Sequence, residues 1–280
     1  MNRISNFFII TNKTRDRDMS VTNITCNILK SLGCSVSLAE CGPLGDGRFL
    51  EEDRVPDGTE CIITIGGDGT IIAAALDTAD LNIPIFGINK GTLGYLTDTE
   101  TGDIVEKLKM LHAGHYTVEE RMMLCGKVFD RDAKLVAETR ALNDIVLRNS
   151  LFKVSDYELS VNSRFLGVFK ADGMIVCTPT GSTAYSMSAG GPIIEPVARM
   201  MVITPICPHT INTRSVVFSA DARVEIRVCD DNSSVVFDGR FHCDLQEGYV
   251  VNVRPSAKVT RIIRTAEDSF LSVLGRKFQA

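Results

Sequence analysis

Residues 61–70 constrain the fold of this chain more than any other segment, because they join an apolar run to a glycine-rich turn. Cys61–Ile65 reads CIITI and predicts a buried strand, Gly66–Thr70 reads GGDGT, and the apolar residues Ile71–Leu76 predict a helix. Glycines at a strand end let the backbone approach a ligand closely. A helix start beside them offers free N–H groups to phosphate oxygens. The segment therefore predicts an α/β domain that binds phosphate groups.

Asp68 stands inside this glycine turn, and its charge narrows the chemistry. A carboxylate repels phosphate, so a site that only bound phosphate would not favour an acid there. The acid is useful if it takes a proton from a hydroxyl group or orients a metal next to the phosphates. The alternative is a plain turn, since Asp-Gly is a frequent turn pair. Three glycines at a strand end favour the functional interpretation, a phosphotransferase.

The rest of the N-terminal half alternates strands with helices. Phe7–Ile10, Val36–Leu38 and Ile83–Asn89 predict strands, and the apolar residues between 21 and 29 recur at helical spacing. This alternation predicts a parallel sheet with crossover helices. Ligands of such sheets bind outside the carboxyl ends of the strands, where Asp68 and Asn89 both lie. Residues 41–58, rich in Gly, Asp and Glu, are expected to form a loop.

After a helix expected at about 101–112, the pattern changes to mostly short strands. Val224–Val228 and Val250–Arg254 alternate with period two, and residues 162–164 read as the turn of a hairpin. From Leu124 to Thr265 the chain therefore predicts an all-β sandwich or barrel. Residues 270–278 suit a closing helix.

Composition excludes several classes of partner. A formal net charge of −5 argues against nucleic acid, and the apolar runs are far shorter than the ~20 residues that span a membrane. Nine cysteines without a CxxC pair predict free thiols in a reducing cytoplasm. The histidines suggest no metal site, and His112 and His115 are expected to be solvated at a helix end.

Two further segments carry candidate binding residues. Asn143 and Asp144 interrupt an apolar run, and are either a bulge or a pair that hydrogen-bonds a base or ribose. The stretch Asp172–Ser188 crowds hydroxyls and small residues after a strand, which is typical of a surface wrapped around a polar ligand, although a structural loop has a similar composition. Tyr185 could stack on a base there. Lys170 could answer a phosphate charge, or be a solvated strand residue.

Together these residues resemble the NAD kinase family, specifically its bacterial enzymes, from about Ile62 to the C-terminus. The string Thr178–Tyr185 (TPTGSTAY) is long and specific, whereas GGDGT has close relatives in diacylglycerol kinases, sphingosine kinases and phosphofructokinases. The anchors, in chain order, are Gly66–Thr70, Asn89–Leu96, Asn143-Asp144, Asp172–Gly191 and Pro205–Thr210.

The resemblance implies an activity and a domain plan. The activity is transfer of the γ-phosphate of ATP, accompanied by Mg²⁺ or another divalent cation, to the adenosine ribose 2′-hydroxyl of NAD, giving NADP. The plan is an α/β domain with a Rossmann-like parallel sheet over residues 1–100, with the helix 267–280 packing back on it. An all-β sandwich that binds NAD follows over residues 101–266. The resemblance also implies a homodimer or homotetramer with the sandwich domains in contact.

The resemblance assigns roles residue by residue. Asp68 matches the general base and, with Gly69, an NAD-binding position. Asn143 and Asp144 match an adenine- and ribose-binding pair, and Arg240 falls at a more variable contact position. The remaining matches are Lys170 and Asp172 as a basic and an acidic ligand position, and a nicotinamide-nucleotide loop of Thr183, Ala184, Tyr185, Ser186, Met187 and Ser188.

The chain departs from the family pattern at three places. Asp144 stands where Glu is common, Tyr95 replaces a usual Phe, and Ser215 follows Arg214 where bacterial relatives often have Pro. None of these removes a catalytic group. Two other hypotheses share some of the features. A lipid kinase would carry the GGDGT loop together with a membrane-facing surface, and a non-catalytic dinucleotide sensor would keep the binding residues without the Asp68 carboxylate.

Overall fold

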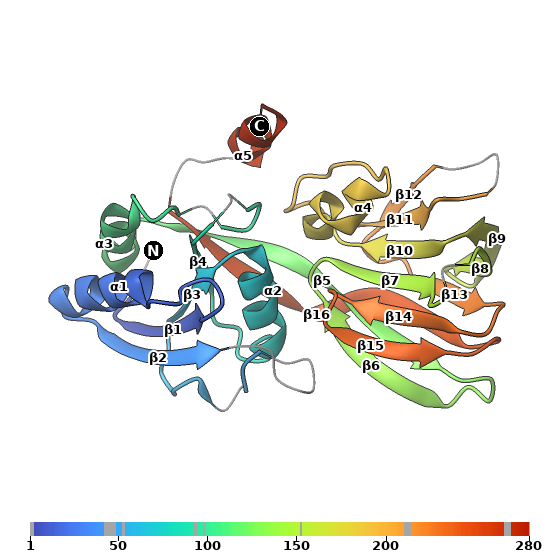
Figure 1. Cartoon of the computed structure of the whole chain (residues 1–280), viewed down its shortest axis with the longest axis horizontal. Helices are drawn as coiled ribbons and strands as arrows, with labels where there is room; N and C mark the ends of the chain where they lie inside the picture. The colour runs from blue at the N-terminus through green and yellow to red at the C-terminus, as the bar shows by residue number, and fades with distance from the viewer. Residues whose placement is uncertain are drawn as a thin grey trace. The chain divides into compact units, whose positions relative to one another are not determined.

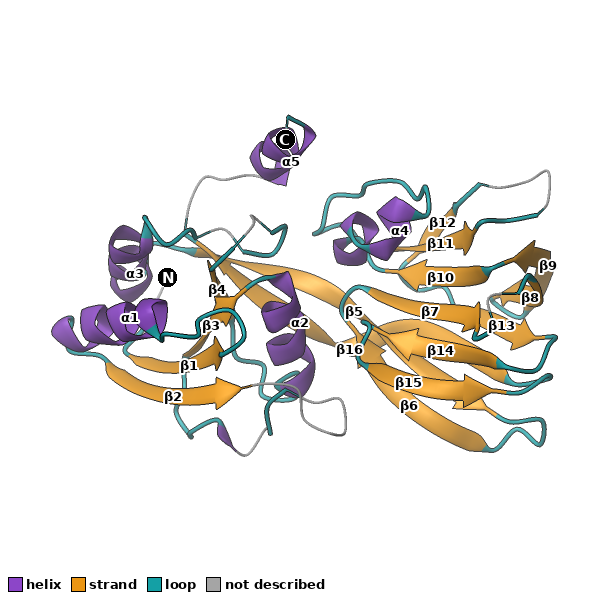
Figure 2. Cartoon of the chain, viewed as in Figure 1, coloured by secondary structure: helices purple, strands orange, loops and turns teal. Residues whose placement is uncertain are grey.

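The computed structural model describes residues 3–41, 49–51, 54–91, 94–97, 99–151, 153–209, 214–265 and 270–279 (Figures 1 and 2). Its contacts divide the chain into two compact units, residues 1–120 with 259–280, and residues 121–258. These divisions fall within strands β5 (Thr117–Phe129) and β16 (Val250–Arg264). Domain boundaries after residue 100 and before residue 267 remain a prediction. The loop expected over 41–58 lies largely outside the described residues.

The first unit is built on a parallel sheet, as the alternation of strands and helices predicts. Its strands are β1 (Asn6–Asn12), β2 (Ser35–Cys41), β3 (Cys61–Gly66) and β4 (Ile85–Asn89), in the order β2-β1-β3-β4. The end of β16 adds a parallel partner to β4 through Ile262 and Ile85. The chain moves outward from β1 to β2 and in the other direction from β3 to β4. The carboxyl ends of β1 and β3 therefore form the switch point at which such sheets bind ligands.

Helices cover both faces of this sheet. The helices α1 (Ser20–Ser31) and α3 (Ile104–Ala113) share one buried cluster with apolar side chains of β1, β3 and β4. On the other face lies α2 (Asp68–Asp77), which begins directly after the glycine turn. A Cβ on Gly87 of β4 would lie 2.5 Å from Ile71 Cδ1, so the glycine lets α2 pack closely against the strand. The helix expected near the C-terminus is α5 (Phe270–Phe278).

His112 corrects an expectation, since it is buried rather than solvated. Only 8% of it is exposed, its Nδ1 lies 2.8 Å from the carbonyl oxygen of Ile4, and Arg3 Nε donates to Nε2 over 3.0 Å. An Nδ1–H that donates to Ile4 leaves Nε2 as the acceptor for Arg3. The histidine therefore ties the start of the chain to α3, a contact that local periodicity does not reveal.

The second unit is an all-β sandwich. One layer is antiparallel in the order β12-β11-β10-β7-β14-β15. The opposing layer contains β8, β9 and β13 with parts of β5, β6 and β16, and apolar side chains from both layers form one buried cluster. The strands are β6 (Leu135–Ala141), β7 (Asp144–Asn149), β8 (Ser155–Val161), β9 (Arg164–Ala171), β10 (Gly173–Cys177), β11 (Met200–Ile206), β12 (Val216–Ser219), β13 (Val224–Val228), β14 (Ser233–Phe237) and β15 (Phe241–Leu245).

Local turn chemistry sets the register of this unit. Asn162 and Ser163 have φ angles of 51° and 62°, so the β8–β9 hairpin closes with the left-handed two-residue turn that its sequence predicts. The segment after β10 forms a short 3₁₀ turn (Thr180–Thr183) and the one-turn helix α4 (Tyr185–Ser188). Ala189 and Ile194 then pack on the outer face of β7, β10 and β11. Within the described residues, no helix is both long and apolar enough for a membrane span.

Candidate active site

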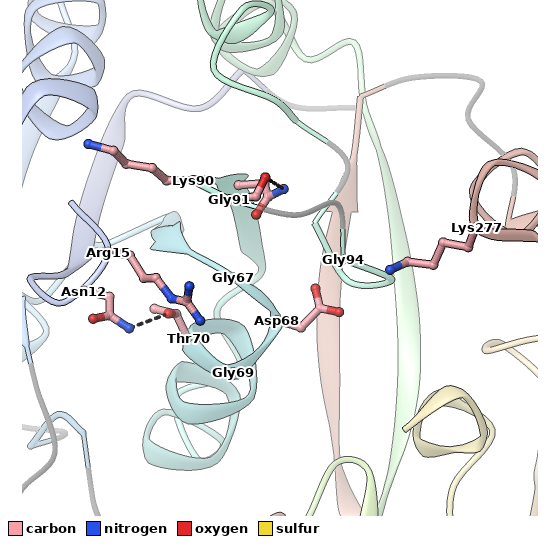
Figure 3. A pocket seen from close by; sticks show the side chains of 11 residues that line it. Asn12, Arg15, Gly67, Asp68, Gly69, Thr70, Lys90, Gly91, Gly94 and Lys277 are labelled. Atoms are coloured by element: carbon pink, nitrogen blue, oxygen red, sulfur yellow. Dashed lines mark hydrogen bonds between the residues drawn. The ribbon is translucent and has the colours of Figure 1, made fainter. Parts of the chain in front are cut away.

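A pocket of about 330 Å³ opens at the switch point of the first unit (Figure 3). The loops that follow β1, β3 and β4 supply its walls, as the topology of a parallel sheet requires, and α5 adds one side chain. The lining residues are Asn12, Arg15, Gly67, Asp68, Gly69, Thr70, Asn89, Lys90, Gly91, Gly94 and Lys277.

Asp68 is the first residue of α2 and, among the described lining residues, the only carboxylate. Its Oδ2 accepts the backbone N–H of Tyr95 over 2.7 Å, and its Oδ1 accepts those of Leu96 and Thr97 over 3.1 and 3.3 Å. Two carboxylate oxygens offer about four acceptor sites. The backbone therefore fixes the orientation of Asp68 and leaves room for about one further donor.

The glycines around Asp68 serve two different purposes. A Cβ on Gly94 would lie 1.9 Å from Asp68 Oδ1, so only glycine lets the 94–97 loop reach the carboxylate. A Cβ on Gly67 or Gly69 would meet no atom within 4 Å and would project into open space. Without side chains, these two residues leave the start of α2 accessible, and its free N–H groups suit phosphate oxygens.

Three cations line the pocket, and they differ in their partners. Lys90 Nζ lies 2.5 Å from Asp16 Oδ1 and 3.0 Å from Asp18 Oδ1. These bonds, to Asp16 first, raise the pKa of Lys90 and offset its charge. Neither Arg15 nor Lys277 makes an ion pair with an acid in the described part of the chain, so both charges face the pocket uncompensated.

Asn89, at the end of β4, adds an unusual acceptor. It is 4% exposed, its Nδ2 donates to the carbonyl of Gly91 over 3.3 Å, and its Oδ1 has no hydrogen-bond partner among the described residues. A buried polar atom without a partner is unfavourable by about 1–3 kcal/mol. Because Asn89 lines the pocket, its oxygen is a natural acceptor for a donor carried by a ligand.

In the second unit, the pair Asn143-Asp144 lies beside the end of β10. Asp144 begins β7 and stands opposite Cys177, and the Thr178 N–H donates to the Asn143 carbonyl over 2.9 Å. A Cβ on Gly181 would lie 2.1 Å from that same carbonyl, so the TPTGSTAY string passes directly over Asn143. The structure thus brings together two segments that the sequence separates by about 40 residues, and neither is a bulge.

Asp144, which is buried, belongs to a pair with the partly buried Asp238, and sequence analysis missed this pair. Asp238, in the turn after β14, accepts the N–H groups of Leu142, Asn143 and Asp144 over 2.6, 2.8 and 2.9 Å. Burial first, and then the negative charge of Asp238, raises the pKa of Asp144 to about 7. Burial also raises the pKa of Asp238, against the effect of its three N–H donors.

The location of the negative charge in this pair follows from the donors. Asp238 receives three backbone N–H groups, whereas Asp144 receives one, from Tyr185. Hydrogen bonds to the ionised form favour it, so Asp238 ionises first and Asp144 keeps the proton longer. Asp-Gly is by itself typical of a turn, and the role of Asp238 depends on the pairing of β14 with β7.

The hydroxyl groups of the 172–188 stretch are mostly used inside the protein. Ser182 Oγ donates to Pro179, Thr178 Oγ1 donates to Leu142, and Ser186 Oγ lies 3.1 Å from Thr204 Oγ1. These bonds fold the loop, so its composition reflects structure as much as ligand binding. Exposed positions in this loop are Tyr185, Met187 and Ser188, with Thr183 and Ala184 partly exposed.

Two predicted site residues lie elsewhere in this unit. Asp172 precedes β10, whereas Asp144 pairs with its last residue, so they lie at opposite ends of that strand. Lys170 is exposed, and its carbonyl accepts the His209 N–H over 2.7 Å. Within one chain, Lys170 and Asp172 therefore do not join Asn143 and Tyr185. Arg240 follows Asp238 in its turn, and its charge favours the ionised form of that acid.

Both units of the chain are similar to known proteins. The sequence model of one protein family, the ATP-NAD kinase N-terminal domain, matches residues 46–116. The family model of the ATP-NAD kinase C-terminal domain matches residues 142–265. A crystal structure of an NAD kinase from Archaeoglobus fulgidus in complex with ATP has a TM-score of 0.77 at 26% identity, covering 98% of this chain and 99% of that one. A yeast NADH kinase shares the fold, with a TM-score of 0.83 at 21% identity.

Curated relatives extend the match over nearly the whole chain. The NAD kinase of Lachnospira eligens is 38% identical over 290 residues, covering 97% of this chain and 99% of its own. The NAD kinase of Desulforamulus reducens is 41% identical over 223 residues, covering 79% of this chain and 77% of its own. The domain models that match both units and the curated relatives that match nearly the whole length show that the chain belongs to the ATP-NAD kinase family.

Proposed function

We propose that this chain is an NAD kinase in which Asp68 accepts the proton of the adenosine ribose 2′-hydroxyl as the γ-phosphate of ATP is transferred to that oxygen. The observation that carries the assignment is the geometry of Asp68. Backbone N–H groups of Tyr95, Leu96 and Thr97 hold its carboxylate. One acceptor site remains for a hydroxyl proton, in a pocket that otherwise favours phosphate.

Phosphoryl transfer depends on positioning and charge neutralisation more than on covalent help from the protein. The donor phosphates bind the N–H groups at the start of α2, which Gly67 and Gly69 leave open. Arg15 supplies positive charge in the same pocket. As the 2′-oxygen attacks the γ-phosphorus, its proton passes to Asp68, the bond to the β-phosphate oxygen breaks, and ADP leaves.

A divalent cation enters with ATP as part of the substrate. Mg²⁺ prefers oxygen ligands and is usually held by one or two carboxylates together with substrate phosphates. In this pocket the substrate phosphates would supply most of its ligands, with Asn89 Oδ1 as a protein oxygen, because the remaining acceptor site of Asp68 is reserved for the ribose hydroxyl. When bound, the cation would neutralise charge on the transferring phosphate.

The second unit is proposed to bind the dinucleotide. Asn143 and Asp144 present an amide and a carboxyl group for adenine and ribose, and the exposed Tyr185 ring lies in the same cluster. The roles predicted for Lys170, Asp172, Arg240, Ser186 and the rest of the loop remain proposals of the same kind. The edge strand β9 exposes Phe165, Leu166 and Val168, which supports a homo-oligomer. Nine free cysteines support a reducing compartment such as the cytoplasm.

The experiment is direct. Purified protein is incubated with ATP, Mg²⁺ and NAD, and NADP is assayed against a control without enzyme. General-base catalysis is worth about 10²–10⁴-fold, so Asp68→Asn should lose at least about 100-fold in kcat while NAD affinity stays within about threefold. No NADP from the wild-type protein would reject the function. Near wild-type turnover of Asp68→Asn would reject the assigned base.

A further inference from the structure

We propose that Lys277, in the C-terminal helix α5, binds the donor phosphates beside Asp68 and so completes the phosphate site of the first unit. The inference deepens the proposed function and rests on it for the identity of the donor. Lys277 lies about 200 residues from the glycine turn, and no motif marks it. Its assignment comes from the pocket lining.

Lys277 stands at the wall of the pocket that would hold the phosphates. It is a lining residue of the pocket that contains Asp68, Gly67 and Gly69. In Figure 3 its side chain extends from α5 toward the loop of Gly94, on the side of the pocket where Asp68 lies. A phosphate bound at the start of α2 would therefore share this pocket with an ammonium group. A lysine acts on phosphate as a compact point charge with three donors.

The contacts of α5 explain how Lys277 is held there. Its Nζ lies 4.7 Å from the centroid of the Tyr95 ring, and Arg276 Nη1 lies 3.8 Å from Glu100 Oε1. Tyr95 is also the residue whose N–H binds Asp68. The ammonium group therefore contacts the same loop that orients the proposed base. A cation over an aromatic ring is stabilised only weakly at an exposed site, so Lys277 is free to exchange this contact for a phosphate.

Lys277 also changes the balance of charge in the pocket lining. The lining holds Arg15, Lys90 and Lys277 as cations and Asp68 as its carboxylate. Lys90 is bonded to Asp16 and Asp18 and brings little net charge to a ligand. If Lys277 is set aside, Arg15 alone must offset Asp68 before any phosphate is attracted. With Lys277, the lining holds two cations that no described acid pairs, beside the one carboxylate that would otherwise repel ATP.

The packing of α5 argues against a purely structural role for its charge. Val273 is 6% exposed, whereas Leu271 and Phe278 are 72% and 69% exposed. Val273 can anchor the helix without the ammonium group. A lysine kept at the pocket wall without an acidic partner among the described residues is better explained by an anionic ligand.

The test compares Lys277→Gln and Lys277→Arg with Lys109→Ala, which removes an exposed lysine of α3 in the same unit. Affinities for ATP and for AMP are measured by isothermal titration calorimetry at several salt concentrations, together with KM for ATP and NAD. A lost hydrogen bond between charged groups corresponds to about 10–100-fold. We expect Lys277→Gln to weaken the affinity for ATP by that factor and the affinity for AMP by less than about threefold. KM for NAD should change by less than about twofold. Lys277→Arg should recover most of the ATP affinity, and Lys109→Ala should match the wild type.

Salt dependence separates phosphate binding from support of the helix. Removing one cation that contacts phosphate should make ATP affinity fall less steeply with ionic strength, which a support role would not do. Equal losses for ATP and AMP, an unchanged salt dependence or unchanged ATP affinity in Lys277→Gln would each overturn the proposal. Failure of the proposed function would be distinct, because the wild-type protein would then make no NADP, whatever Lys277 does to ATP binding.

Discussion

Replacing Asp144 with Asn should stabilise the ligand-free protein at neutral and alkaline pH while weakening NAD binding. Asp144 is 6% exposed, and burial together with the charge of Asp238 raises its pKa from 3.8 to about 7. The folded protein thus retains this proton to a higher pH than the unfolded chain does. The corresponding stability is fully present below pH 3.8 and is lost as the pH rises through about 7.

The size of this change in stability follows from the shift in the pKa of Asp144. A shift of one pKa unit corresponds to about 1.4 kcal/mol of unfolding free energy. The wild-type protein therefore loses about 4 kcal/mol in all as the pH rises, and roughly 3 kcal/mol of this loss falls between pH 5 and pH 8. Asn has nearly the same shape as Asp and does not ionise. Subtracting the unfolding free energy of the wild type from that of Asp144→Asn should therefore give a difference that grows by roughly 3 kcal/mol from pH 5 to pH 8.

Urea denaturation of ligand-free protein across this pH range measures the difference. Asp221→Asn, which changes an exposed acid of the same unit, serves as the control and should give a flat difference. NAD affinity of Asp144→Asn should fall at the same time, because the proposed ribose contact loses its carboxylate. If the difference in unfolding free energy stays constant with pH within about 0.5 kcal/mol, burial and the charge of Asp238 do not raise the pKa of Asp144.

Two further substitutions test the loops that hold the proposed site residues. Gly94→Ala would place a Cβ 1.9 Å from Asp68 Oδ1 and should lower kcat at least tenfold while the thermal midpoint falls only slightly, whereas Gly102→Ala, with no atom within 4 Å, should change neither. An active Gly94→Ala enzyme would show that the observed orientation of Asp68 is not needed. Asp238→Ala removes the acceptor of three partly buried N–H groups and should reduce the unfolding free energy by roughly 3 kcal/mol, with a higher KM for NAD. Unchanged stability in denaturant titration would contradict that account.

Local features of the sequence were the ones that could be predicted. The strand, glycine turn and helix around Asp68 follow from hydrophobic pattern and backbone chemistry, and the structure has them as β3 and α2. The Asn162-Ser163 hairpin and the parallel sheet of the first unit follow in the same way. Family membership, in turn, favours the NAD kinase hypothesis over a lipid kinase or a sensor.

Features that depend on long-range pairing could not be predicted. Asp238 reaches Asn143 and Asp144 only because β14 pairs with β7, and His112 is buried only because α3 packs near the start of β1. Hydroxyl-rich composition was ambiguous for another reason. A serine that folds a loop and a serine that binds a ligand have the same side chain, and Ser182 proves to do the former.

An acid in a phosphate pocket now has a physical explanation. Alone, Asp68 would repel each phosphate group that approached it. In the fold, backbone N–H groups take up three of its acceptor sites, and it stands at the positive end of α2. Arg15 and Lys277 add two positive charges that acids of the described chain do not neutralise, whereas Lys90 is paired with both Asp16 and Asp18. The pocket can therefore attract ATP and still hold a carboxylate close to the transferring phosphate, which a proton acceptor in this reaction requires.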